Sequence, residues 1–238
     1  MINWLERTEL MVGENGIEKL MDSHVLIAGV GGVGGYAVEQ IVRAGVGKIT
    51  IIDADVVNPT NRNRQMPALV STDGMKKVDI VKERCLDINP KIKIVASDIF
   101  LNDETIQELF SNMNYDFVVD AIDTLSPKVA LIQEAVKRNI PIISSMGAGG
   151  KMDPSKVFIS DISKSYNCNL ARMVRKRLHK SDVHRGITVV FSPEDVDASH
   201  VIHIEGEQYK KTTVGTISYM PALFGIYAAS HVIRELLK

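Results

Sequence analysis

A doubly wound α/β fold is what this sequence predicts, and three observations lead to it. Short runs rich in Val and Ile alternate along the chain with longer amphipathic segments. The first run leads into a glycine-rich turn over residues 29–34, and the second ends on an acidic residue, Asp53. Continuous apolar strands joined by helices form parallel sheets with helices on both faces, so we expect a Rossmann-like, mainly parallel sheet.

Each expected element follows from its own pattern. Val/Ile-rich runs predict strands at residues 25–30, 48–53, 92–96, 117–120 and 140–144, and amphipathic segments predict helices at 33–44, 75–88, 103–113 and 128–138. The helix at 75–88 has an apolar stripe formed by Val78, Val81, Cys85 and Ile88. After residue 150 the alternation weakens. Short strands at 157–159, 187–191 and 201–204 and a helix at 170–178 predict a short mixed C-terminal extension.

Length and composition suit one domain of ordinary type. The chain has 238 residues, of which 45% are hydrophobic and 24% charged, as expected for a chain with a sizeable core. We therefore expect one domain over 1–238, with a nucleotide-binding core at 1–150 and a substrate-facing extension at 151–238. A net charge of −1 excludes a globally basic nucleic-acid binder, although it permits a local basic patch.

Cysteine content and apolar stretches bear on metals and on location. Cys85 and Cys168 are the two cysteines, too few for a zinc site built from CxxC pairs or for a disulfide framework. We expect no zinc and a reducing, cytoplasmic setting. The stretch 212–233 lacks charged residues but contains Pro, Gly, Ser and His, so a buried loop and helix is favoured over a membrane span.

The glycine turn predicts a nucleotide site. Its glycines are Gly29, Gly31, Gly32 and Gly34. Glycines between a strand and a helix let phosphates approach backbone N–H groups at the helix N-terminus. Asp53 follows about twenty residues later, where a carboxylate can bind ribose hydroxyls. These features also fit a nicotinamide enzyme, so an NAD-dependent oxidoreductase is an alternative.

Residues after the second strand favour ATP chemistry. They are Asn61, Arg64, Gln65 and Lys77. A dehydrogenase expels no highly charged leaving group and needs no such cluster. An enzyme that attacks the α-phosphate of ATP releases pyrophosphate, whose charge Arg and Lys stabilise in the transition state.

Five motifs resemble those of the ATP-dependent adenylating enzymes, the family that includes the ubiquitin-activating enzymes. They are GVGGVG at 29–34, DAD at 53–55, NRNRQ at 61–65, GMKKV at 74–78 and DAID at 120–123. The resemblance covers residues 1–150 and implies that ATP and Mg²⁺ bind here.

The resemblance assigns roles to individual residues. Asp53, with Asp55 of the same motif, would lie at the ribose, while Asn61, Arg64, Gln65 and Lys77 would bind the phosphates. Asp123 would coordinate Mg²⁺. Arg7 matches an arginine that reaches into the site of a partner subunit, which implies a homodimer.

Simpler interpretations exist for the same residues. Asp53 could be a turn residue or a helix N-cap, and Asp123 an N-cap of the helix that follows it. Arg64 and Lys77 could be ordinary solvated charges. Asp120 is expected to support its strand end rather than to bind metal. The joint occurrence of these residues, at spacings that the fold can bring together, favours the site.

Segments of the second half resemble a narrower branch of that family, the tRNA threonylcarbamoyladenosine dehydratases. These segments lie at residues 146–154, 170–178 and 213–219. The branch activates the threonyl carboxylate of a modified adenosine in tRNA as an acyl-adenylate and cyclises it with loss of water. It needs neither zinc cysteines nor a cysteine relay in its own chain. Cys85 lies on the apolar stripe of its helix and is expected to be a core residue. Cys168, beside a basic helix, could instead be activated.

The sequence is compatible with further ligands, partners and activities. The resemblance leaves open a monovalent cation, Na⁺ or K⁺, at the turn 147–150, and a sulfur-transfer partner of the cysteine desulfurase type. The alternative within the family is an adenylyltransferase that activates the C-terminus of a ubiquitin-like sulfur-carrier protein. A nucleotide-binding scaffold without activity is a further alternative.

A basic helix provides an independent reason to expect tRNA. No acidic residue occurs from 162 to 181, while six residues there are Lys or Arg. Leu170, Val174 and Leu178 recur at helical spacing and should face the protein. Arg172, Arg175 and Lys176 should then point outward and bind phosphates. The simpler interpretation is a solvated helix face.

Overall fold

Seven strands form one sheet in the order β3-β2-β1-β4-β5-β7-β6 in the computed structural model, which describes residues 4–203 and 212–238. Neighbouring strands run parallel except at the edge, where β6 is antiparallel to β7. The strands are β1 (His24–Ala28), β2 (Lys48–Ile52), β3 (Lys93–Ser97), β4 (Phe117–Asp120), β5 (Ile142–Ser145), β6 (Phe158–Asp161) and β7 (Thr188–Phe191). The predicted Rossmann-like, mainly parallel sheet is confirmed.

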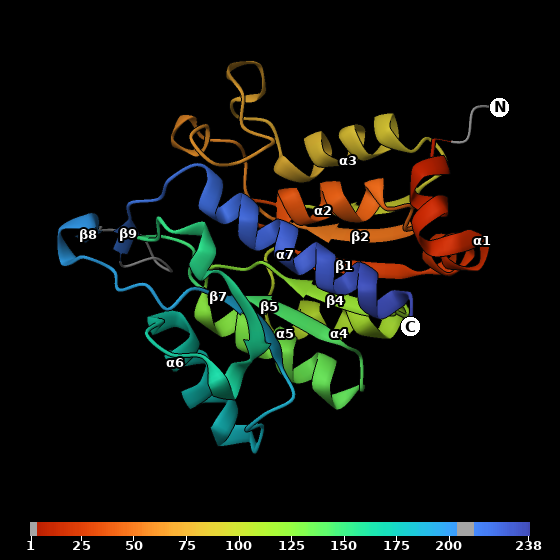
Figure 1. Ribbon diagram of the computed structural model, residues 1–238. Coiled ribbons are helices and arrows are strands. Elements are labelled where there is room, and N and C mark those ends of the chain that lie inside the picture. The colour runs from red at the N-terminus through yellow and green to blue at the C-terminus, as the bar shows by residue number, and fades with distance from the viewer. Residues whose placement is uncertain (1–3, 204–211) are drawn as a thin grey trace.

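Helices cover both faces of the sheet (Figure 1). One face carries α1 (Glu6–Asp22), α2 (Gly34–Arg43), α3 (Lys77–Ile88) and α7 (Tyr219–Leu236). The other carries α4 (Asp103–Asn112), α5 (Leu125–Lys137) and α6 (Asn169–Leu178). A small second sheet pairs β8 (Val201–His203) with β9 (Thr212–Val214). The strand expected at 201–204 is thus found at 201–203, while residue 204 lies outside the described residues.

The central strand β1 shows why its sequence is continuously apolar. Val25 and Ile27 point into the core formed with α2, α3 and α7. Leu26 and Ala28 point into the core formed with α4, α5 and α6. Since successive side chains of a strand alternate between faces, a strand buried on both sides is apolar except where a buried polar group finds a partner.

Helix α7 supports the glycine turn from outside. A Cβ on Gly225 would lie 2.2 Å from the carbonyl oxygen of Val33, so α7 crosses the start of α2 at backbone contact distance. Phe224 and Ala228 of the same helix are fully buried. Within the uncharged stretch, residues 219–233 therefore belong to a helix with a buried face, as predicted. The buried loop expected before that helix is wrong, because residues 213–218 are exposed or partly exposed. Among residues 4–203 and 212–238, no helix has the length and apolar character needed to cross a bilayer.

Helix α1 was not predicted from the sequence. Of its residues, only Gly16 and Leu20 are buried, whereas Leu10 and Met11 are more than four-fifths exposed. Gly13 breaks its regular geometry with φ 73° and ψ 170°. A helix with two buried positions has no clear apolar stripe, so periodicity could not reveal it.

Candidate nucleotide-binding site

The glycine turn joins β1 to α2 at the carboxyl edge of the sheet. Gly29 has φ 87°, and its N–H donates to the Ile52 carbonyl at 2.7 Å. A Cβ on Gly29 would lie 2.8 Å from the Ala121 carbonyl oxygen, and one on Gly34 only 1.7 Å from the Gly29 carbonyl oxygen. These two positions accept only glycine, and the turn they permit opens the N-terminus of α2 to a ligand.

Asp53 lies beside this turn, at the end of β2. Its Oδ2 accepts from the Val30 N–H at 2.8 Å, and its Oδ1 accepts from the Asp55 N–H at 2.9 Å. Burial raises the pKa of the Asp53 carboxyl, although the Lys77 charge opposes this. The carboxylate is therefore held in one orientation next to the glycine turn.

Lys77 begins α3 and reaches toward the same edge. Its Nζ lies 2.7 Å from Asp55 Oδ2, and its N–H donates to the Asp55 carbonyl at 3.1 Å. The Lys77 side chain is 4% exposed, while that of Asp55 is 71% exposed. A buried lysine stem thus carries its ammonium group to an exposed carboxylate at the mouth of the site.

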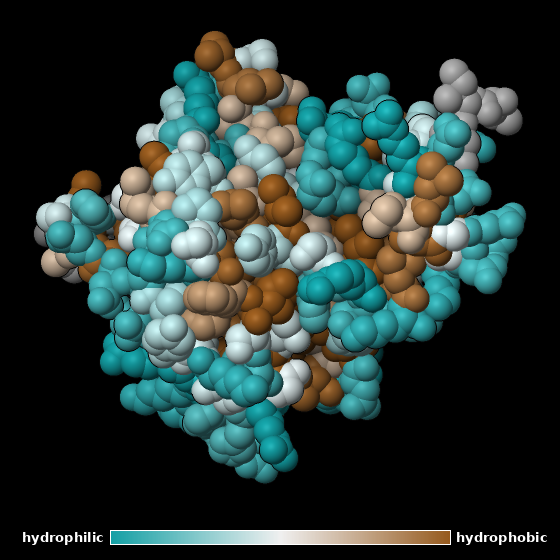
Figure 2. Space-filling model, in the orientation of Figure 1, coloured by the Kyte–Doolittle hydropathy of each residue, from teal (hydrophilic) through white to brown (hydrophobic). Residues whose placement is uncertain are grey.

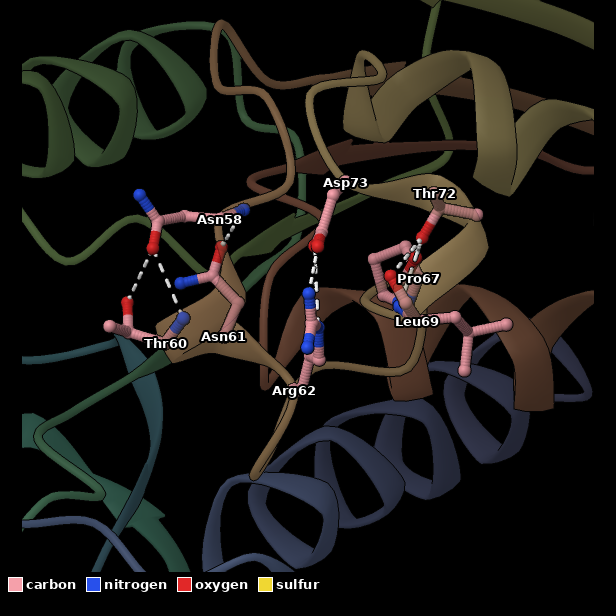
Figure 3. Close-up of polar contacts among 8 residues, drawn as sticks. All are labelled: Asn58, Thr60, Asn61, Arg62, Pro67, Leu69, Thr72 and Asp73. Carbon is pink, nitrogen blue, oxygen red and sulfur yellow. Dashed lines mark hydrogen bonds and ion pairs between the residues drawn. The ribbon is translucent and has the colours of Figure 1, made fainter.

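The segment 58–73 is stiffened by its own polar contacts (Figure 3). Asn58 Oδ1 accepts from the Thr60 N–H at 3.1 Å, and the Asn58 N–H donates to Asn61 Oδ1 at 3.1 Å. Arg62 is tied to Asp73 by an ion pair. Arg62 therefore braces the loop, and Asn61 has a structural role in capping its turn.

Arg64 and Gln65 lie against the glycine turn. The position of a Cβ on Gly31 is 3.5 Å from Gln65 Nε2, and that on Gly32 is 3.5 Å from the Arg64 carbonyl oxygen. Among the described residues, Gln65 Oε1 is a buried side-chain oxygen without a hydrogen-bond partner. Buried polar atoms are rarely left unsatisfied, so this oxygen indicates a donor that arrives with a ligand.

Asp123 lies near Arg64, at the same edge of the sheet. Burial lowers the pKa of the half-buried Arg64 guanidinium, while the charge of Asp123 raises it. Arg64 Nη1 also donates to the Thr60 carbonyl at 3.0 Å. Asp123 is exposed, and Thr124 occupies the N-cap position of α5. The N-cap interpretation of Asp123 is therefore wrong, and its side chain lies within the electrostatic reach of Arg64.

A buried ion pair underlies the Asp123 turn. Lys128 Nζ lies 2.7 Å from Asp120 Oδ2 and donates to the Ser145 carbonyl at 2.9 Å. Asp120 Oδ1 accepts from the Ile122 N–H at 3.1 Å, and both charged side chains are fully buried. Asp120 therefore supports its strand end, as predicted. The sequence analysis did not identify Lys128 as a buried residue. The signal that could have revealed it is its position beside the buried apolar residues of α5.

A cavity of about 650 Å³ lies between the loops that follow β3 and β4. It is lined by residues 100–104, residues 124–127 and Arg177 of α6. Arg177 Nη1 donates to Ser126 Oγ at 2.8 Å. The volume falls in the usual range for small-molecule pockets. Arg177 was not among the predicted site residues, because only the fold brings α6 to this loop.

Arg7 lies far from these residues in its own chain. Leu5, two positions earlier, packs on Gly45 just after the end of α2, whereas the glycine turn precedes α2. Ten helical residues span about 15 Å, so α1 and the site lie at opposite ends of α2. Figure 1 shows this separation, with α1 and the loop before α3 at opposite sides.

The basic helix α6 corrects one prediction. Arg172 and Lys176 are exposed, as expected. Arg175 instead folds back, and its Nη1 donates to the Ser165 carbonyl at 2.8 Å and to the Ile162 carbonyl at 3.3 Å. The outward orientation expected for Arg175 is thus wrong, because the carbonyl groups of the preceding loop lie within its reach.

The two cysteines lie in different parts of the fold, Cys85 in α3 and Cys168 at the start of α6. Within the described ranges, no group of three or more His, Cys, Asp or Glu side chains is placed to hold a metal ion. Burial raises the pKa of the Cys85 thiol to about 12, which suits a core residue. Cys168 is also buried, at the start of α6.

The fold and the site define an α/β nucleotide-binding protein, with a glycine turn, a strand-end carboxylate and two cationic side chains on one edge of the sheet. A sequence model described as the ThiF family matches residues 5–238, and the chain belongs to that family. The resemblance to the adenylating enzymes is therefore confirmed.

Particular relatives narrow the comparison. The chain is 40% identical over 245 residues to a tRNA threonylcarbamoyladenosine dehydratase of Bacillus subtilis. The aligned region spans 100% of this chain and 96% of that relative. It is similar to the crystal structure of the E. coli tRNA N6-threonylcarbamoyladenosine dehydratase with ATP. The TM-score is 0.89 and the identity 32%, over 100% of this chain and 96% of that one. The AMP complex of that enzyme gives a TM-score of 0.87. The predicted resemblance of this chain to the tRNA threonylcarbamoyladenosine dehydratases is confirmed.

Proposed function

We propose that this chain is an ATP-dependent tRNA threonylcarbamoyladenosine dehydratase. One observation carries the proposal: Arg64 adjoins the glycine turn at Gly32, and the Lys77 ammonium lies close enough to Asp53 to act on its charge, so two cationic residues lie around the position that phosphates would take. The full-length similarity to dehydratases of this name supports the choice of substrate.

ATP fits the residues at this edge. The ribose hydroxyls would bind Asp53, and the phosphates would lie over the glycine turn toward Arg64 and Lys77. The adenine would enter the cavity between residues 100–104 and 124–127, in the segments that follow β3 and β4. Gln65 Oε1, buried without a partner among the described residues, would gain a donor from the bound nucleotide.

The proposal also includes two bound ions, Mg²⁺ and a monovalent cation. Mg²⁺ usually binds through one or two carboxylates together with phosphate oxygens and waters, and the exposed Asp123 carboxylate can supply one such ligand. When bound, the ion would neutralise charge on the phosphates. Na⁺ or K⁺ would bind carbonyl groups of the turn 147–150, where the Lys151 ammonium already donates to the Glu194 carbonyl.

The proposed reaction has two steps. The threonyl carboxylate attacks the α-phosphorus of ATP, the bond to the β-phosphate oxygen breaks, and pyrophosphate leaves toward Arg64 and Lys77. A group of the ureido unit then attacks the activated carbonyl, the ureido unit loses one proton to water, and AMP leaves with one carboxylate oxygen. The nucleoside loses one water, whose oxygen is retained in AMP. The protein contributes positioning and charge stabilisation.

A second copy of the chain would complete the site. Arg7 cannot reach the glycine turn of its own chain, so it would act in the site of a homodimeric partner. Leu10 and Met11 of α1 are 83% and 85% exposed, and Figure 2 shows hydrophobic side chains near α1. Apolar groups of this kind favour a protein contact over solvent.

Substrate tRNA would contact Arg172 and Lys176 of α6, and dimerisation would double that basic surface. A sulfur-transfer protein of the cysteine desulfurase type is the further partner in the proposal. With these partners, the proposed location of the protein is the cytoplasm.

The test is an incubation of the protein with ATP, Mg²⁺ and tRNA. Transfer RNA bearing the threonylcarbamoyl group should give AMP and a nucleoside lighter by one water, and tRNA lacking the group should give neither. AMP formation with a Gly-Gly-ended carrier protein instead would identify a carrier-protein adenylyltransferase. An absorbance change with NAD(H) would identify an oxidoreductase. Either result would contradict the proposal.

A further inference from the structure

Three aromatic rings cluster at the edge of the sheet beside α6. Phe158 and Phe191 are cross-strand partners in β6 and β7, with ring centroids 6.1 Å apart. The Tyr166 ring packs edge-on to Phe191 at 5.8 Å. Phe191 is buried, but Tyr166 and Phe158 are 55% and 43% exposed. The buried ring therefore supports two rings that solvent can reach.

This cluster lies on the same edge as the nucleotide site. Phe191 is the last residue of β7, and β7 is two strands from β4 in the sheet, a distance of about 10 Å. The chain after β5 connects the two regions, since the Met146 N–H donates to the Val190 carbonyl at 2.8 Å. A polymer bound at the site could therefore extend onto the aromatic rings.

Positive charge accompanies the rings. Lys164 and Arg172 are exposed in the segments on either side of Tyr166, and residues 162–181 contain no acidic side chain. The nearby Asp161 carboxylate accepts from the N–H groups of Ser163 and Gly186. Figure 2 shows mainly hydrophilic side chains over the side of the molecule where Figure 1 places α6.

The loop that carries Tyr166 is held from beneath. Arg175 of α6 donates to the carbonyls of Ile162 and Ser165, and Ser165 is itself buried. Arg175, expected to bind tRNA phosphates, thus fixes the residues that precede Tyr166. A fixed ring loses little conformational freedom when a flat partner stacks on it.

We propose that Tyr166, Phe158, Lys164 and Arg172 form an aromatic-basic surface on which an unpaired nucleobase of the substrate RNA stacks. The inference rests on the proposed function, since RNA is its substrate. Single-stranded RNA is recognised by aromatic side chains that stack on bases and by cations that bind the adjoining phosphates. Both groups are present here within one short stretch of chain, next to the edge where the reaction would occur.

The test compares Tyr166→Ala with Tyr166→Phe in the full-length protein. The probe is a single-stranded RNA of about ten nucleotides with one 2-aminopurine, whose fluorescence falls when the base stacks. Tyr166→Ala should weaken binding about fivefold to a hundredfold and remove the quenching. Tyr166→Phe, which keeps the ring, should bind within about twofold of the parent protein.

Charge is tested separately. Arg172→Ala should lower the slope of log K against log salt by about one, as expected for loss of one phosphate contact. Lys91→Ala is the matched control, because this exposed lysine precedes β3 at the opposite edge of the sheet. It should leave the slope unchanged.

Two outcomes would contradict the proposed RNA-stacking surface and leave the proposed function unaffected. The first is turnover of modified tRNA by Tyr166→Ala with an unchanged KM for tRNA. The second is loss of the dimer, rather than of RNA binding, in Tyr166→Ala, which would show a protein contact. Conversely, if the parent protein formed no AMP, the proposed function would be rejected. The RNA-binding measurement would still test the aromatic-basic surface by itself.

Discussion

The Lys77 ammonium lies 2.7 Å from the Asp55 carboxylate, with the lysine side chain 4% exposed and the aspartate 71% exposed. The contact joins the start of α3 to the end of β2, on the same edge as the glycine turn. It places a cation beside Asp53, whose carboxyl pKa that cation lowers against the effect of burial. ATP could take over the lysine from Asp55 with little rearrangement of the fold.

Loss of the Lys77 charge should therefore disable the first chemical step. Lys77→Ala should reduce the rate of AMP formation about a hundredfold to a thousandfold, as expected when one stabilising group is lost. Lys77→Arg should retain more activity, because it keeps the charge. Lys76→Ala is the matched control, since Lys76 is exposed and paired with Asp98. A folded Lys77→Ala protein with parent-like rates would exclude this role.

The buried Asp53 gives a prediction about pH. Burial raises its pKa above the ordinary value of 3.8, so the folded state binds the proton more tightly than the unfolded state. Its contribution to stability is present below pH 3.8 and is lost as the pH rises through the folded-state pKa.

Asp53→Asn removes that titration. The free energy of unfolding of the variant minus that of the parent should increase as the pH rises above 3.8, and then level off. Urea unfolding of both proteins from about pH 4 to pH 7 measures the difference. A difference that stays flat or falls with pH would refute the buried carboxylate. The KM for ATP should also rise in the variant, since one ribose acceptor is lost.

The Lys128–Asp120 pair should matter for stability. Lys128→Met leaves a buried carboxylate without its cation and should cost about 3–5 kcal/mol of unfolding free energy. Adding Asp120→Asn removes the unpaired charge and should recover part of the loss. Lys238→Met, at the exposed pair with Glu235, should change stability by about 1 kcal/mol or less. If the double variant were no more stable than Lys128→Met, the charge would not be the cause.

The dimer proposal predicts complementation between two inactive proteins. Arg7→Ala and Lys77→Ala dimers each lack a group in both sites. Equal mixing and exchange of subunits makes half of the dimers mixed, and each mixed dimer has one intact site, so about a quarter of the parent activity should return. Light scattering verifies that the mixture is dimeric. A dimeric mixture with no recovered AMP formation would show that Arg7 does not act across the interface.

The sequence was informative wherever a site residue is placed by a strand end or a tight turn. Asp53 and the glycines could be located because the ends of parallel strands meet at one edge of the sheet. Arg64 and Gln65 lie in the loop that follows β2, and that loop brings them back against the glycine turn.

Other features depend on contacts that spacing does not encode. Arg175 and Arg177 lie two positions apart on α6, yet one braces a loop and the other reaches Ser126. Lys128 looked like the start of a helix, but α5 begins at Leu125 and buries this lysine against Asp120. Such roles are set by which element packs on which, so they became visible only with the fold.

The central claim is that a carboxylate of the substrate attacks the α-phosphorus of ATP. Oxygen-18 in the threonyl carboxylate of the modified tRNA tests it most directly, by mass analysis of the products. We predict one labelled oxygen in AMP for each nucleoside cyclised, and none in pyrophosphate. Unlabelled AMP, or the label in inorganic phosphate with release of ADP, would contradict the account.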